Sequence, residues 1–69
     1  MIALPNRHLD AARSLARLAR YLSRRAVQEA RAGANRRAEV YRDSAKWHLN
    51  KARDRRDMAD ELDERRTAA

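Results

Sequence analysis

The side chains that could perform acid–base or metal chemistry are few and widely separated. The 69-residue chain has two histidines, His8 and His48, and no cysteine. Neither histidine has a second histidine or a glutamate at the spacing of a helical metal site, and no glycine-rich loop could hold a phosphate. His48 falls on the inward side of its expected helix, which is typical of a helix-interface residue. We therefore expect no enzymatic activity, no cofactor and no metal site.

The carboxylates gather near the end of the chain, in the segment DMADELDE from Asp57 to Glu64. This segment could attract a cation, but it lacks the turn residues of a calcium-binding loop. Residues 57–69 carry a net charge of −3 and residues 1–56 carry +10, which together give the formal net charge of +7. A basic body of this kind favours nucleic acid, an anionic membrane or an acidic protein surface as a partner.

Arginines supply most of the positive charge, and a row of them follows one side of the first expected helix. The row, named here the arginine stripe, has the helical spacing i, i+4, i+7, i+11 and i+18. Such a row can neutralise phosphates, form a solvated polar face, or pair with the acidic segment if the chain folds back. The members of the arginine stripe are Arg13, Arg17, Arg20, Arg24 and Arg31.

Sequence-specific DNA recognition is not favoured by this pattern. Reading bases in the major groove usually requires a compact helix-turn-helix unit, and the helices expected here are too long for one. A platform of aromatic and basic side chains for single strands is also not evident. Non-specific nucleic-acid binding through the arginine stripe therefore stays as the alternative to a protein partner.

The elements that must position these side chains are helices. Alanine, leucine, arginine, glutamate and lysine dominate the chain and favour helix, while β-branched residues are scarce. Pro5 and Asn6 suit the first turn and the N-terminal cap of a helix expected over residues 6–32. The only glycine, Gly33, suits a C-terminal cap. Asn35 then suits the cap of a second helix, expected over residues 36–66.

A break in the alanine pattern favours a hairpin over one long helix. Alanines recur at every seventh position before and after Gly33, but the two series differ in phase, since Gly33 and Ala38 are five positions apart. A continuous coiled coil would lose its register there, although a long helix could tolerate one glycine at a cost of ~1 kcal/mol. We therefore expect an all-α fold in which residues 1–69 form a single domain, an antiparallel helical hairpin with its turn at residues 33–35. The two series are Ala12, Ala19, Ala26 and Ala38, Ala45, Ala52, Ala59.

The larger apolar residues are too few for an ordinary monomeric core. Half of the apolar residues are alanines, and a chain of this length often needs a partner subunit. Leucines beside the alanine series and a second apolar row on the second helix should remain uncovered, so we expect two hairpins to pair into a dimeric four-helix bundle. A docking surface for a different protein is the alternative. The residues expected in this core or dimer contact are Leu15, Leu18, Leu22, Val40, Met58 and Leu62.

Three aromatic side chains complete the set of residues expected to contact a partner. Tyr21 lies on the polar side of the first helix, where an exposed tyrosine suits an interface anchor, although an ordinary surface tyrosine has the same position. Tyr41 and Trp47 lie on the second helix, and Trp47 belongs to its second apolar row. With the arginine stripe, these aromatic residues form the expected partner-binding surface.

Membrane association is not favoured. No window approaches the ~18 uncharged apolar residues of a membrane span, and the start MIALPNRHLD lacks the pattern of a signal peptide. A basic amphipathic helix can lie on a membrane, but here the apolar side is mostly alanine and anionic lipid would repel the acidic segment. We therefore expect a soluble cytoplasmic protein with no membrane partner.

In size, helical-hairpin pattern, basic charge and expected dimerisation, the whole chain resembles small phage-encoded inhibitors of bacterial host proteins. It is most similar in these respects to the quorum-sensing anti-activators of Mu-like Pseudomonas phages. The resemblance implies a compact helical dimer that binds the DNA-binding domain of a LuxR-type transcription activator and keeps it from its promoter. It also implies a second target, the assembly ATPase of type IV pili. It transfers no functional residue, because it rests on no shared motif.

Three functions therefore stand at this stage. The first is a non-enzymatic, dimeric inhibitor that binds host proteins in the host cytoplasm, with a transcription activator and a pilus ATPase as implied targets. The second is a basic helical protein that binds nucleic acid through the arginine stripe. The third is a structural or assembly helix pair, which would self-associate beyond a dimer.

Overall fold

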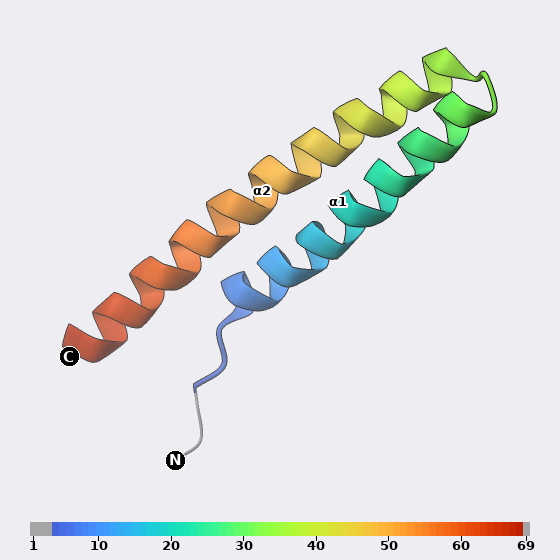
Figure 1. Ribbon diagram of the computed structural model, residues 1–69. Helices are drawn as coiled ribbons and strands as arrows, with labels where there is room; N and C mark the ends of the chain where they lie inside the picture. Colours follow the sequence, from blue (N-terminus) through green and yellow to red (C-terminus); the bar gives the residue numbers. More distant parts are fainter. Residues whose placement is uncertain (1–3, 69) are drawn as a thin grey trace.

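The computed structural model describes residues 4–68, which form two long helices packed against each other as an antiparallel hairpin (Figure 1). α1 spans Arg7–Arg31 and α2 spans Asn35–Ala68. The Cα atoms extend over 55 × 20 × 11 Å, so the molecule is two helices wide and one helix thick. No strand occurs within residues 4–68, and the predicted all-α hairpin is confirmed.

The start of α1 is set by Asn6. Its backbone is extended, with φ −131° and ψ 100°, and its side-chain oxygen accepts a hydrogen bond from the backbone N–H of Leu9 at 3.2 Å. This bond satisfies one of the backbone donors that the first turn of a helix leaves free. The predicted role of Asn6 as the cap of the first helix is confirmed.

The turn between the helices is a compact C-terminal cap built on Gly33, whose φ is +81°. The N–H of Gly33 donates to the carbonyl of Ala30 at 3.1 Å, and the N–H of Ala34 donates to the carbonyl of Glu29 at 2.8 Å. This pair of bonds is the Schellman arrangement, which requires a left-handed residue at the position that Gly33 occupies. Gly33 therefore ends α1 and reverses the chain.

Asn35 does not cap the second helix, contrary to the sequence expectation. The carbonyl of Ala34 accepts the first helical bond, from the N–H of Ala38 at 3.0 Å, and Asn35 is already the first residue of α2. The reason is the tightness of the turn: Ala34 both closes the cap of α1 and precedes α2. The second helix thus begins without a polar side chain at its cap position.

The core between the helices consists of alanine. Every buried apolar residue among residues 4–68 belongs to one of the two alanine series, with exposed fractions from 2% to 7%. These series face each other along the hairpin and are named here the alanine seam. Small side chains at every seventh position let two helix backbones approach closely. The buried residues are Ala12, Ala19, Ala26, Ala38, Ala45, Ala52 and Ala59.

At the open end of the hairpin, the side chain of Asn6 also joins the two helices. Its side-chain Nδ2 donates to the carbonyl of Ala59 at 3.1 Å and to Oδ1 of Asp63 at 3.2 Å, across the gap between the helices. The guanidinium of Arg66 also donates to the carbonyl of Pro5 at 2.8 Å. Asn6 is 8% exposed, so one side chain caps α1 and fastens it to α2.

Candidate functional site: a basic groove and an apolar face

One long side of the hairpin carries a groove between the two helices. Two adjoining hollows form it, and they share Ala16, Arg20 and Leu49, so the groove is continuous. Its floor is made of alanines together with Ser23 and Leu49, and cationic side chains form both rims. We name this feature the basic groove. Its cationic residues are Arg13, Arg17, Arg20 and Arg24 from α1 and Arg42, Lys46, Arg53 and Arg56 from α2.

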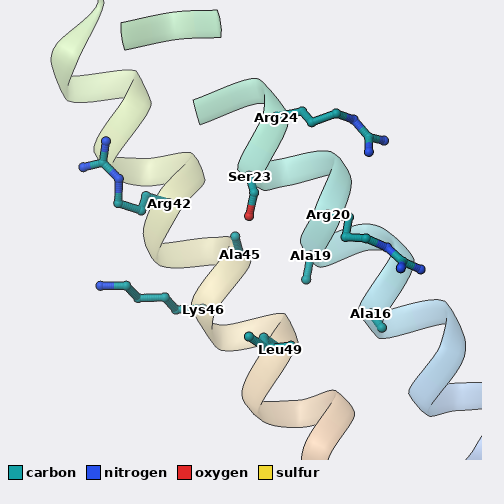
Figure 2. Close-up of a pocket in the computed structure, with 9 residues that line it drawn as sticks. All are labelled: Ala16, Ala19, Arg20, Ser23, Arg24, Arg42, Ala45, Lys46 and Leu49. Carbon is teal, nitrogen blue, oxygen red and sulfur yellow. The ribbon is translucent and has the colours of Figure 1, made fainter. Parts of the chain in front are cut away.

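The cationic rim side chains of the basic groove point outward, away from its apolar floor. In Figure 2 the rim side chains of the two helices point away from each other, and Ala19, Ala45 and Leu49 lie between them. At the ~1.5 Å rise per residue of a helix, each rim is roughly 15 to 20 Å long. Of the described residues, no aspartate or glutamate lines either hollow. The groove therefore concentrates positive charge on both sides of an apolar strip.

The arginine stripe of the sequence analysis forms one rim of this groove, except for Arg31. Arg31 lies at the last turn of α1 and lines neither hollow. Arg17 donates to the hydroxyl of Ser14 at 3.2 Å. The four ion pairs found among residues 4–68 involve other cations, so no carboxylate neutralises a rim residue within the hairpin.

The suggested pairing of the arginine stripe with the acidic segment is therefore not present. The contacts of Asn6 with Ala59 and Asp63 show the reason. They place the acidic segment beside the cap of α1, whereas Arg13 lies almost two helical turns further along α1.

Sequence reasoning found only half of the groove. The rim on α2 follows the spacing i, i+4, i+7, i+11 and i+14 through Arg42, Lys46, Leu49, Arg53 and Arg56. This is the same helical signal that identified the arginine stripe, and a search along the second helix would have detected it. The antiparallel packing then brings the two rows to the same side of the hairpin.

Most of the larger apolar residues lie outside the basic groove, beside the alanine seam or on the outer sides of the helices. Leu15, Leu22 and Leu62 lie half-buried beside the alanine seam. Exposed apolar side chains continue outward from them, and together these residues are named the apolar face. The exposed members are Leu18 (42%), Val40 (64%), Trp47 (55%) and Met58 (46%).

The residues expected in a core or dimer contact thus lie at the surface of the single hairpin or at the edge of its seam. Every buried apolar position of the seam is an alanine, so these larger residues lie outside the seam. Their contact with a second copy stays a prediction. Tyr21 is also exposed, at 51%, as expected for its polar side of α1.

Polar contacts cross the seam on the side of the apolar face. The guanidinium of Arg25 lies 5.4 Å from the ring centre of Tyr41 and pairs with Glu29 at 2.9 Å. Glu29 also pairs with Arg37 of α2 at 3.5 Å. Side-chain hydrogen bonding and charge from Tyr41, and to a lesser degree the charge of Glu29, raise the pKa of Arg25. Tyr41 is therefore engaged within the hairpin, unlike the exposed Tyr21.

Both histidines make structural contacts. Nδ1 of His48 lies 2.7 Å from the carbonyl oxygen of Ser44, one turn earlier in α2. A carbonyl only accepts, so this contact is a hydrogen bond in the tautomer with its proton on Nδ1. The ring of His48 also meets the edge of Trp47, with 4.9 Å between ring centres. Nδ1 of His8 lies 3.0 Å from the guanidinium of Arg55, which joins the two helices.

Neither a cluster of metal ligands nor a membrane-spanning helix is found in the part of the chain that the structure describes. Residues 4–68 contain no group of three or more histidine, cysteine, aspartate or glutamate side chains placed to hold a metal ion. Within the same range, neither helix is long and apolar enough to cross a membrane.

The chain was compared with known protein families, proteins and structures. No family model, no curated protein and no solved structure matches the chain.

Proposed function

We propose that this chain is a non-enzymatic inhibitor that acts by binding host proteins. The supporting observation is the apolar face, where Leu18, Val40, Trp47 and Met58 are all more than two-fifths exposed while the core is alanine. Several large apolar side chains that stay exposed on one small protein are candidates for an interaction site. The resemblance to phage anti-activators is consistent with such a surface.

The target that the resemblance implies is the DNA-binding domain of a LuxR-type transcription activator. In this proposal, a dimer of the hairpin occupies that domain in the host cytoplasm and competes with promoter DNA. The assembly ATPase of type IV pili is a second target in the same proposal. Inhibition of this kind needs a rigid platform with an aromatic or arginine anchor, for which Trp47, Tyr21 and the arginine stripe are candidates.

A competition experiment tests the proposal. A purified LuxR-type DNA-binding domain bound to its promoter fragment is titrated with the chain, and the bound fraction is followed by gel shift. We expect promoter DNA to be released, and the chain and the domain to co-elute in size-exclusion chromatography. Persistent promoter binding at saturating chain, with no co-elution, would refute this target.

The contribution of the apolar face is tested with a matched pair of variants. The first replaces three apolar residues, Leu18, Val40 and Met58, by glutamine. The control replaces three exposed, uncharged residues by glutamine, so that the net charge stays the same in both variants: Ala30, Asn35 and Asn50. The proposal expects lost inhibition or lost dimerisation only in the first variant.

Nucleic-acid binding is the second candidate function. The observation that favours it is the basic groove, whose eight rim cations face no carboxylate among the described residues. Such binding would weaken steeply with salt, with a slope of roughly 0.7 to 0.9 per neutralised phosphate on a log–log plot. Pull-down from bacterial lysate with and without nuclease separates the candidates, because capture through nucleic acid disappears after digestion.

A further inference from the structure

We propose that the basic groove is the docking site for an acidic amphipathic helix of a protein partner. The proposed occupant has a narrow apolar stripe with aspartate or glutamate on both sides of it. This inference rests on the proposed protein-binding function and names the chemistry of the segment that is bound. It assigns the apolar face and the basic groove to separate contacts.

Charge complementarity is the first argument. Positive rims lie on both helices, and only the apolar floor separates them. A guest helix with carboxylates on both flanks would meet a cationic rim on each side. Arginine suits this task because its planar guanidinium binds carboxylates through two parallel hydrogen bonds. Seven of the eight rim cations are arginines.

The shape of the floor is the second argument. On α1 the floor residues are small, Ala16, Ala19 and Ser23, which leaves room for a third helix to approach closely. On α2 the floor contains Leu49, which is 42% exposed and is the one large apolar side chain in the groove. An apolar stripe on the guest would cover Leu49 and the alanines around it. Association would then bury apolar area in addition to pairing charges.

Nucleic acid fits the same groove less well. Single strands bind through aromatic side chains on which bases stack, and none of the described residues that line the groove is aromatic. The floor offers one side-chain hydroxyl, that of Ser23, and otherwise only aliphatic groups. A phosphate backbone gains nothing from an apolar floor, whereas an amphipathic helix does.

The acidic segment sets the end of the docking site. Asp60, Asp63 and Glu64 continue the spacing of the α2 rim past Arg56, and they line a separate acidic hollow. A guest rich in carboxylates is repelled there. The site is therefore about three to four helical turns long, which matches the length of the two rims.

Direct binding to designed peptides tests the inference with the full chain. The probe is a fluorescein-labelled helical peptide of about 20 residues, long enough to hold helix, with leucines on one stripe and glutamates on both flanks. The matched probe has the same charge, with glutamine in place of every leucine. A single-stranded oligonucleotide of similar charge is the third probe. We expect the leucine peptide to bind most tightly, by roughly tenfold over the glutamine peptide.

Charge reversal within the groove gives the central comparison. The variant Arg20→Glu/Lys46→Glu changes one exposed residue on each rim, and the control Arg7→Glu/Arg36→Glu makes the same change in net charge at exposed positions outside the groove. We expect the groove variant to bind the leucine peptide at least roughly tenfold more weakly, and the control to change affinity about twofold or less. Circular dichroism verifies that both variants keep their helices.

A floor variant distinguishes an amphipathic helix from a simple polyanion. Leu49→Gln leaves the charge unchanged, so it should weaken only the leucine peptide, by roughly fivefold, and leave the oligonucleotide unaffected. Equal binding of all three probes would overturn the inference, as would tightest binding of the oligonucleotide. A second copy as the occupant would also overturn it, and would appear as loss of self-association in Arg20→Glu/Lys46→Glu without peptide binding. If the peptides fail to bind while promoter DNA is still released, this inference fails and the proposed function stands.

Discussion

The basic groove and the apolar face are two different surfaces of one hairpin with a single alanine seam. The groove side is flanked by cations and has a single large apolar residue, Leu49, on its floor. The apolar face consists of leucine, valine, methionine and tryptophan, and Glu29 near it pairs with Arg25 of the same helix and with Arg37 of α2. Because every buried apolar residue among residues 4–68 is an alanine, the larger apolar side chains stay at least partly exposed. A two-helix protein can in this way present two chemically different faces at once.

The largest expected effect comes from a change that removes both faces together. Ala19→Leu adds a bulky side chain at a seam position that is 5% exposed, and it would force the helices apart. We expect a loss of about 3 kcal/mol in unfolding free energy, at the upper end for overpacking, and a loss of both groove and face. Ala30→Leu, at an exposed position of α1, is the control. Thermal melts followed by circular dichroism measure both, and equal melting temperatures would contradict the seam.

The second prediction concerns the hydrogen bonds of Asn6 that join the two helices at the open end. Asn6→Asp keeps the oxygen that caps α1 but removes both Nδ2 donors and places a carboxylate beside Asp63. We expect the free energy of unfolding to fall by about 2 kcal/mol, the usual cost of unpaired buried polar groups. The two helices would then separate first at the open end. Faster amide hydrogen exchange of residues 55–63 would detect this separation. Asn50→Asp, at an exposed site on α2, should change stability little.

The third prediction concerns the turn that brings the faces together. Gly33→Ala meets no steric contact within 4 Å, so its cost arises only from the positive φ of +81°. We expect a loss of about 1 kcal/mol, the cost of a left-handed backbone for a residue with a Cβ atom. Chemical denaturation with urea measures it, and binding at both faces should persist. A loss above about 3 kcal/mol would contradict this account, because it would require a steric clash at Gly33 in addition to the backbone cost.

The smallest effect on the isolated hairpin is expected at the apolar face. The triple variant Leu18→Gln/Val40→Gln/Met58→Gln changes only exposed residues, so the unfolding free energy of the dilute chain should shift by less than about 0.5 kcal/mol in total. Self-association, measured by sedimentation, should nevertheless be lost. This separation of stability from association sharpens the contrast between the faces. A triple variant that unfolds while the chain is monomeric would mean that the apolar face belongs to the core.

The helices and their reversal were predictable because they depend on neighbouring residues. Helix propensity indicated both elements, and Asn6 and Gly33 indicated the start and the end of the first helix. Asn35 misled the prediction of the second cap, because the Schellman turn had already given that position to Ala34. A local rule fails where one residue serves two elements.

The candidate site was only half predictable. The arginine stripe follows from spacing on one helix, but the groove exists only because Arg42, Lys46, Arg53 and Arg56 lie across the seam from it. The bonds from Asn6 to Ala59 and Asp63 likewise join residues more than 50 positions apart, which no local pattern reveals.

The sequence by itself determined the two helices, the chain reversal at Gly33 and the seven-residue repeat of alanine, because each depends on the conformational preference and spacing of nearby residues. Only the tertiary structure decided which sides of the helices combine. In an antiparallel pair, equivalent sides of the two helices fall on the same side of the seam. The two rows of cations therefore meet as one groove, and most of the larger apolar residues stay outside it.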